Sequence, residues 1–164
     1  PGPLEANAQA TIGELLEPKR GEGRSRDVPG EALPRTGSPE NRRSAQRENE
    51  TANALARRGF RVEQLPEGTV GPLGGSPDYK VNGRLWDCYA PGKTTLDNIR
   101  TTISGKVRRQ APRVILNIGD LKTHTLEDIA QRLRSAPVKG LEELWALDGD
   151  ELLEFVDGSW RRVV

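Results

Sequence analysis

Residues 76–90 read Ser-Pro-Asp-Tyr-Lys-Val-Asn-Gly-Arg-Leu-Trp-Asp-Cys-Tyr-Ala, and the rest of the chain can be arranged around this stretch. Asn82-Gly83 stands between two runs of β-forming residues, and Asn-Gly in that position is the strongest short signal for a hairpin. We therefore predict antiparallel strands at residues 78–81 and 84–90. The hairpin sets Asp78 and Asp87 on opposite sides of its turn, where their carboxyl groups can converge.

The flanking segments alternate between helical and strand patterns. Residues 44–58 have a small-residue apolar face (Ala45, Ala52, Leu55 and Ala56) and are followed by Gly59, which favours the helix end. A second helix runs from a cap at Thr94 or Thr95 to about Gln110, and a third is expected at residues 125–134. The predicted strands are 60–65, the continuous apolar run 114–118, and a C-terminal meander of 144–147, 152–156 and 160–164.

The predicted order of elements, α-β-β-β-α-β-α-β-β-β, indicates an α/β fold, more narrowly an α+β mixed sheet with helices on its faces and a C-terminal β-meander. Residues 1–40 hold six glycines, six prolines and no aromatic residue. They can bury too little apolar surface to offset the entropy cost of ordering. We predict a flexible linker at 1–40 and a folded domain at 41–164, with the alternative that Leu15 and Leu16 anchor the linker on the domain.

The composition excludes several classes of protein. The 164 residues carry a net charge of +1, too little to argue for nucleic-acid binding by itself. A single cysteine, Cys88, rules out an internal disulfide, and a single histidine, His124, removes most histidine-based mechanisms. No apolar run reaches the ~18 residues of a membrane span. Because the chain starts with Pro1 and has no methionine, we expect a piece released from a larger precursor, or a cloned part of one.

Asp78, Asp87 and Lys106 are the candidate catalytic residues. Two carboxylates hold a hard divalent cation, and a lysine orients a water or stabilises the charge that develops on phosphate. Asp87 is the hardest to explain otherwise, because aspartate is depleted in the middle of strands. Each also has an ordinary structural explanation: Asp78 as a turn residue, Asp87 as a paired or edge-strand residue, and Lys106 as a lysine whose stem covers the core.

A third carboxylate is expected from the first helix, where Glu48 and Glu50 are the candidates. We prefer Glu50 because it stands closer in sequence to the small residues Ala52 and Ala54. A basic rim with one aromatic residue is expected to contact phosphates and stack on a base; it consists of Lys93, Arg100, Arg108, Arg109, Arg113 and Tyr89. The basic residues would equally suit a solvated helix face.

Several motifs occur together in the order found in one known family. They are Glu48-Asn49-Glu50-Thr51-Ala52, Leu55-Ala56, residues 59–66, Ser76-Pro77-Asp78-Tyr79, Asp87-Cys88-Tyr89-Ala90-Pro91, Asn98-Ile99-Arg100, Lys106 and Val114-Ile115-Leu116-Asn117. Over roughly residues 45–120 the chain resembles the C-terminal tRNA nuclease toxin domains of contact-dependent growth inhibition (CDI) proteins of the CdiA type.

The resemblance implies a metal-dependent endonuclease with a variant of the PD-(D/E)xK restriction-endonuclease core. Carried over to this sequence, Glu50, Asp78 and Asp87 bind a divalent metal ion (Mg²⁺, Mn²⁺ or Zn²⁺), and Lys106 is the catalytic lysine. Asp87-Cys88-Tyr89 stands where the common pattern has Glu-x-Lys. The lysine therefore has to come from the following helix.

The resemblance also implies a biological setting. We expect a toxin that is secreted or delivered from the cell surface as the C-terminal part of a larger protein. It would cleave tRNA in the target-cell cytoplasm, and a cognate immunity protein would cover its cleft. Two alternatives stay open: a DNase of the same fold, and a non-catalytic module that binds nucleic acid or a partner protein.

Overall fold

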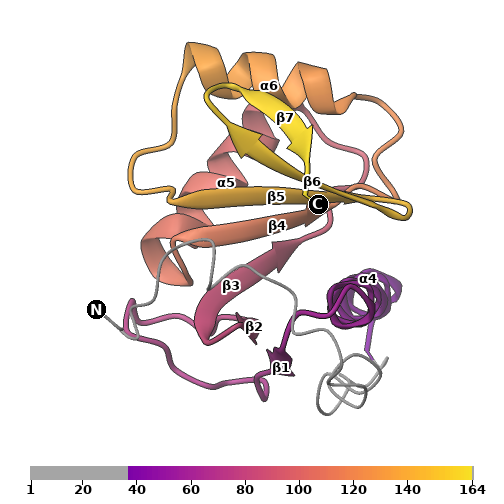
Figure 1. The fold of residues 1–164 in the computed structure, drawn as a ribbon, viewed down its shortest axis with the longest axis vertical. Coiled ribbons are helices and arrows are strands. Elements are labelled where there is room, and N and C mark those ends of the chain that lie inside the picture. Colours follow the sequence, from indigo (N-terminus) through magenta and orange to yellow (C-terminus); the bar gives the residue numbers. More distant parts are fainter. Residues whose placement is uncertain (1–36, 164) are drawn as a thin grey trace.

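The computed structural model describes residues 37–163, and the order of elements in them is the predicted one (Figure 1). Most of the expected linker, 1–36, lies outside the described residues. The helices are α4 (Pro39–Arg57), α5 (Leu96–Arg109) and α6 (Leu126–Ser135). The strands are β1 (Val62–Gln64), β2 (Tyr79–Val81), β3 (Arg84–Tyr89), β4 (Arg113–Asn117), β5 (Glu143–Asp148), β6 (Glu151–Val156) and β7 (Ser159–Arg162).

The seven strands form one mixed sheet in which their spatial order equals their chain order. β3, β4 and β5 are parallel to one another, and the pairs on either side of them are antiparallel. Each parallel pair is connected by a helix, α5 or α6, as parallel pairing requires. The mixed sheet and the C-terminal meander are thus confirmed.

The predicted hairpin forms around Asn82 and Gly83, which have φ angles of 49° and 86°. Both central residues of a type I′ turn need positive φ, and Asn-Gly meets that need at low cost. The turn fixes the register, in which Tyr79 lies opposite Trp86. One residue earlier, the backbone N–H of Asp78 donates to the carbonyl of Trp86 at 3.1 Å. The pairing of β2 with β3 therefore ends next to Asp78.

Helix α4 begins at Pro39 and not at Ser44, where the apolar pattern placed its start. The side chain of Ser38 accepts a hydrogen bond from the Asn41 N–H at 3.1 Å, and proline at the first helical position already has a helical φ angle. Apart from the exposed Pro39, residues 39–43 are polar or charged, so periodicity alone did not detect this first turn. The helix therefore begins two residues before the predicted start of the domain at residue 41.

The helices cover both faces of the sheet and enclose two cores (Figure 1). On one face, α4 packs on a cluster that includes Trp86 and Trp145, whose ring centroids lie 4.3 Å apart. On the other face, α5 and α6 cover a cluster that includes Val114 and Leu116 of strand β4, which is buried from Val114 to Asn117. Aromatic contacts of this kind add about 0.5–1.5 kcal/mol beyond simple burial. Within residues 37–163, no helix is long and apolar enough to cross a membrane.

Candidate active site

The candidate site lies where β2 and β3 separate. β3 continues past the end of its pairing with β2, and its residues Asp87, Cys88 and Tyr89 pair with β4. At this fork, the carboxylate of Asp78 accepts a hydrogen bond from the backbone N–H of Cys88 at 2.8 Å. The hairpin thus brings Asp78 next to the strand that carries Asp87, as the sequence predicted.

Asp87 and Lys106 form a buried ion pair. Successive side chains of a strand point to opposite faces, and Cys88 packs in the α4 core while Tyr89 packs in the α5 core. Asp87 therefore faces α5, where the Lys106 Nζ lies 2.6 Å from its Oδ2. The side chain of Asp87 is 3% exposed and that of Lys106 is 22% exposed. Lys106 is held at the site by the carboxylate that it neutralises, with its ammonium within reach of solvent.

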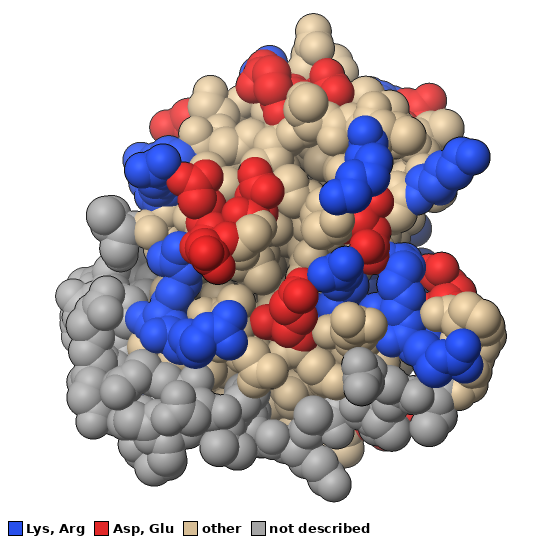
Figure 2. Space-filling view, turned by 90° about the vertical axis from the view of Figure 1, so that its right-hand side faces the viewer, with Lys and Arg blue, Asp and Glu red and all other residues tan. Residues whose placement is uncertain are grey.

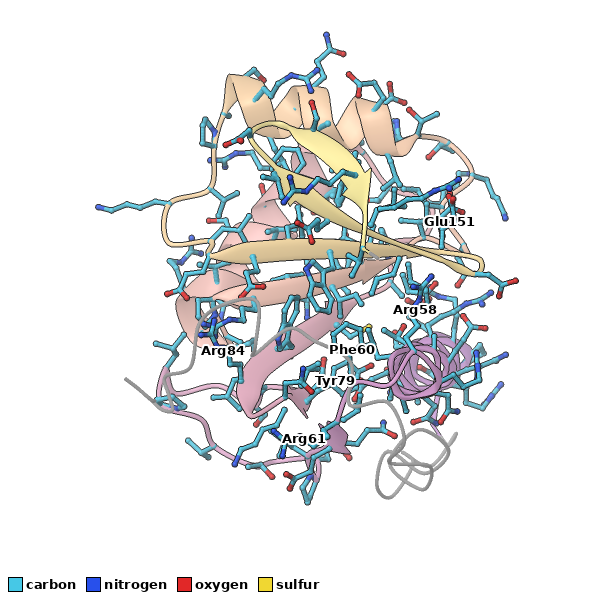
Figure 3. The ribbon with its side chains drawn as sticks, in the orientation of Figure 1. Arg58, Phe60, Arg61, Tyr79, Arg84 and Glu151 are labelled. Carbon is cyan, nitrogen blue, oxygen red and sulfur yellow. The ribbon has the colours of Figure 1, made fainter. Side chains whose placement is uncertain are left out.

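Glu48, and not Glu50, joins the two aspartates. The hydroxyl of Tyr79 donates to the backbone carbonyl of Glu48, and this hydrogen bond ties the middle of α4 to β2 one residue beyond Asp78. In Figure 3, Tyr79 points from β2 toward α4. The carboxyl groups of Glu48 and Asp78 share a hydrogen bond. The three carboxyl groups of Glu48, Asp78 and Asp87, together with Lys106, are called the carboxyl cluster below.

The phase of the helix places Glu48 on the side of the aspartates and directs Glu50, the preferred candidate, elsewhere. Glu48 lies four residues before Ala52 and seven before Leu55, on the face that packs against the sheet. Residues that are two positions apart in an α-helix differ by about 200° around its axis, so Glu50 points away from the face that carries Glu48. Its side chain is 46% exposed, pairs with Arg47 at 2.9 Å, and accepts a hydrogen bond from Asn117 at 2.9 Å.

Burial and like charge perturb the carboxyl cluster. Burial raises the pKa of Asp78, and the charges of Asp87 and Glu48 raise it further. Burial also raises the pKa of Glu48, and the charge of Asp87 adds to this effect. Burial alone would lower the pKa of Lys106, but the charges of Asp87 and Asp78 outweigh it and raise the pKa. One lysine thus faces three carboxyl groups, an excess of negative charge that a cation or a proton has to balance.

The cluster opens to solvent through a hollow of ≈ 270 Å³. A second depression of ≈ 440 Å³ adjoins it and shares Ser44, Glu48 and Asp78 with it. The hollow is lined by Glu40, Arg43, Ser44, Glu48, Asp78, Cys88, Tyr89, Ala90 and Lys106. Asp87 is not among these residues and lies beneath the surface of the hollow. We call this space the acidic hollow.

The residue types of the carboxyl cluster suit a divalent cation, although their side chains are not arranged around a common metal position. Within residues 37–163, no three acidic, histidine or cysteine side chains are already arranged to hold a metal ion. Mg²⁺, however, is commonly held by one or two carboxylates, with waters and substrate phosphates as its other ligands. Glu48 and Asp78 are two such oxygen donors, and they line a hollow that opens to solvent. Their pKa values are raised by burial and, to a smaller extent, by the negative charge of Asp87, and a bound cation would favour their ionised forms.

The predicted basic rim does not assemble around the acidic hollow. Arg100 donates to the backbone carbonyls of Ala136 and Pro137, at 2.5 and 2.8 Å, and so joins α5 to the end of α6. Arg113 is paired with Glu142 and Glu143. Lys93, Arg108 and Arg109 are exposed, and none lines the hollow. Of the aromatic and basic candidates only Tyr89 does, with its ring centroid 6.0 Å from the Lys106 Nζ.

A basic residue that the sequence prediction missed, Arg43, does line the hollow. Arg43 and Arg47 both bind Asp120, which follows β4, with N–O distances of 2.7 and 2.8 Å. These hydrogen bonds lower the pKa of Asp120 to about 2, with Arg47 as the main cause. We call Arg43, Arg47, Glu50, Asn117 and Asp120 the paired network. A signal was present in the sequence, because Arg43 and Arg47 are one helical turn apart and Asn117 interrupts an apolar strand.

A larger cleft lies elsewhere, at the hairpin end of β3. It measures ≈ 660 Å³ and is lined by basic side chains (Arg84, Arg108, Arg113 and Lys139) over an apolar floor of residues such as Leu85 and Val107. Figure 3 places Arg84 on the side of the molecule away from α4. Arg84 and Arg113 are already paired with Glu143. We assign the chemistry to the smaller acidic hollow because perturbed carboxyl groups gather there.

Known proteins are similar to this chain in sequence and in fold. A family model described as "Contact-dependent growth inhibition CdiA C-terminal domain" matches residues 75–152. The protein named tRNA nuclease CdiA-2, from Burkholderia pseudomallei (strain 1026b), is 40% identical over 107 residues, which are 65% of this chain and 3% of that protein. The present chain thus spans only a small part of that relative's length.

A solved structure, the CdiA-CT/CdiI toxin and immunity complex from Burkholderia pseudomallei, contains a chain of the same fold. It is 33% identical to this chain with a TM-score of 0.63, and the match covers 82% of this chain and 96% of that one. The fold is therefore that of a toxin domain from such a complex. The chain belongs to the family of CdiA C-terminal domains.

Proposed function

We propose that this domain is a metal-dependent ribonuclease toxin that hydrolyses phosphodiester bonds of tRNA. The observation that carries the proposal is the convergence of Glu48, Asp78, Asp87 and Lys106 at the fork between β2 and β3. The relative named tRNA nuclease CdiA-2 supports the choice of tRNA as substrate. We also propose that the fork is a PD-(D/E)xK-type core whose lysine has moved from β3 to α5.

In this proposal Glu48 and Asp78 hold a divalent cation, and Asp87 orients Lys106. A bound cation would polarise the phosphate and favour ionisation of a water at neutral pH. The Glu48 oxygen that does not face the cation accepts the proton of the attacking water, and the leaving oxygen takes up a proton from solvent. The ammonium of Lys106 stabilises the charge that develops on phosphate as the bond to the leaving oxygen breaks.

The family membership supports two further proposals about the setting. We propose that the domain is delivered to a target cell as the C-terminal part of a longer protein and acts in the cytoplasm of that cell. We also propose that a cognate immunity protein binds it, because the structural relative was solved as a toxin and immunity complex.

The test is to incubate the purified chain with total bacterial tRNA and with plasmid DNA, in Mg²⁺, Mn²⁺, Zn²⁺ or EDTA. Asp78→Asn is assayed beside the parent. We expect tRNA cleavage that needs a divalent cation and is lost in the variant. Cleavage that survives EDTA would remove the metal mechanism, cutting of DNA alone would change the substrate, and no cleavage of either would favour a binding module.

A further inference from the structure

We propose that Arg43 is a phosphate-binding residue at the rim of the acidic hollow, and that the Glu40 carboxylate occupies its binding edge when no substrate is present. The proposal rests on the proposed nuclease function, which supplies the phosphodiester. It adds a substrate contact outside the carboxyl cluster and a side chain that competes with the substrate for this contact.

The two edges of the Arg43 guanidinium have different partners. Nη1 points inward and donates to Asp120 at 2.7 Å and to the carbonyl of Ala90 at 3.1 Å. Nε and Nη2 point outward and donate to the two oxygens of Glu40 at 3.3 and 2.6 Å. The inner edge is therefore fixed by the folded domain, and the outer edge presents two parallel donors.

Those two outer donors suit a phosphate group. Arginine binds carboxylate and phosphate oxygens through the same two-donor geometry. The Glu40 carboxylate thus stands in the place that two oxygens of a phosphodiester would take. Its side chain is 70% exposed, and an ion pair between exposed residues one turn apart is weak. A polyanion can displace it at little cost.

The position of Arg43 relates this contact to the chemistry. Arg43 lines the acidic hollow together with Glu48, Asp78 and Lys106, and it also contacts the backbone that directly follows Tyr89 on β3. A phosphate held by Arg43 would therefore lie on the same RNA strand as the phosphodiester bond that is cut, and close to that bond. On the side of the molecule that carries α4, basic and acidic side chains lie next to one another and form no large patch of one sign (Figure 2). Affinity for a polyanion then depends on freeing individual arginines.

Asp120 acts here as a positioning residue. Its pKa is lowered to about 2 by the hydrogen bonds from Arg47 and Arg43, so it is an anion at any pH near neutrality. It holds the inner edge of Arg43 and leaves the outer edge for the ligand. Loss of Asp120 should weaken binding only when Arg43 is present.

The experiment measures binding of labelled total bacterial tRNA to the full chain carrying Asp78→Asn, which prevents cleavage. Arg43→Ala should weaken binding about tenfold or more and reduce the salt dependence by about one phosphate contact. Arg43→Lys should restore part of the affinity, because it keeps the charge and loses the two-donor edge. Arg42→Ala is the matched control, since Arg42 is exposed and its side chain donates to the Gly37 carbonyl, away from the hollow.

The decisive variant is Glu40→Gln. A merely structural role for the Glu40–Arg43 pair predicts unchanged or weaker tRNA binding when the pair is broken, whereas competition predicts binding about threefold tighter. Asp120→Ala should weaken binding in the parent and have no further effect in Arg43→Ala. Equal affinity of Arg43→Ala and Arg42→Ala, or no tightening in Glu40→Gln, would overturn the proposal.

The same series separates this proposal from the proposed nuclease function. If the chain without Asp78→Asn cleaves tRNA but its Arg43→Ala variant has the parent's KM and kcat, the nuclease function stands and the phosphate contact fails. If no variant cleaves nucleic acid with any cation and binding still follows the pattern above, the nuclease function fails and the phosphate contact stands.

Discussion

Helix α4 contributes to two groups of charged residues that differ in how their charges are balanced. The carboxyl cluster contains three carboxyl groups for one lysine, and the pKa values of Asp78 and Glu48 are raised. The paired network binds its carboxylates to two arginines and an amide, and the pKa of Asp120 is lowered to about 2. In the first group, burial and neighbouring negative charge disfavour the ionised carboxyl groups. In the second group, ion pairs hold α4 on the sheet.

The difference shows how residues of a candidate active site can be distinguished from residues that stabilise the fold. Groups that only stabilise a fold are selected for matched partners, whereas a site that binds a cation or a phosphate has to leave charge unbalanced. Substitutions should therefore have opposite consequences in the two groups. Loss of a carboxyl group from the carboxyl cluster should remove cleavage without loss of stability. Loss of charge in the paired network should lower stability and should affect the nucleic acid only through the Arg43 contact.

The largest effect is expected from Asp78→Asn. The change removes one of the three carboxyl groups of the buried cluster, while the amide oxygen can still accept from the Cys88 N–H. Cleavage should fall about a thousandfold, and the melting temperature should stay equal or rise. Single-turnover cleavage and a thermal melt measure the two quantities. Asp150→Asn, at an exposed turn position, is the control. A variant that keeps a tenth of the parent's rate would contradict the assignment.

The next effect tests the helix phase. Glu48→Gln should reduce cleavage about a hundredfold, the usual contribution of a positioned acid or base. Glu50→Gln changes the same residue type two positions away, outside the hollow, and should change cleavage by less than about threefold. Initial rates on the same tRNA preparation compare the two. Equal losses would show that the side chains share one role, and a larger loss for Glu50→Gln would restore the sequence-based preference.

Asp120→Ala should lower stability more than it lowers cleavage. Loss of its two arginine partners should cost about 1–2 kcal/mol in the free energy of unfolding at pH 7. Because the pKa of Asp120 is lowered when folded, its contribution is present above the ordinary carboxyl value of about 4 and is lost as pH falls through about 2. Urea unfolding at pH 7 and pH 3 should therefore give a smaller difference between parent and variant at pH 3. Asp97→Ala breaks an Asp–Arg pair whose carboxylate is 80% exposed, and should leave the midpoint unchanged.

The smallest effect is a pH dependence with the reverse sign. The folded pKa values of Asp78 and Glu48 are raised, so their contribution to stability is complete below pH of about 4 and is lost as pH rises through the folded values. From pH 5 to pH 8 the melting temperature should fall by about 2–4 °C for each kcal/mol lost, and Mg²⁺ should restore it. Thermal melts of the parent and of Asp78→Asn test this. A fall of the same size in Asp78→Asn, or no response of the parent to Mg²⁺, would argue against the cluster as its source.

Local patterns predicted most of the fold. Asn82-Gly83 needs positive φ at both positions, and this requirement alone fixed the hairpin and the register that brings Asp78 to β3. The continuous apolar run in β4 predicted a buried central strand. Lys106 was placed correctly beside Asp87 because both lie on regular elements whose periodicity is visible in the sequence.

The remaining features depend on partners that are distant in sequence. Arg43 and Asp120 are 77 residues apart. The spacing of Arg43 and Arg47 marks them as a pair on one helix face, but it does not identify Asp120 as their partner. Arg100 was expected to contact phosphate, but its partners are backbone carbonyls, which leave no trace in the sequence. Glu50 was preferred by its distance along the chain, although the angle around the helix decides what a residue contacts.

The hydrogen bond from Tyr79 to the Glu48 carbonyl has a consequence for timing during folding. Glu48 comes from α4, Asp78 directly precedes β2, Asp87 comes from β3 and Lys106 from α5, so no continuous segment of the chain holds the group. A chain whose other elements have folded but whose α4 has not docked still lacks Glu48. The group is therefore complete only once α4 has docked, and under the proposed nuclease function a chain that is still extended would lack a complete site.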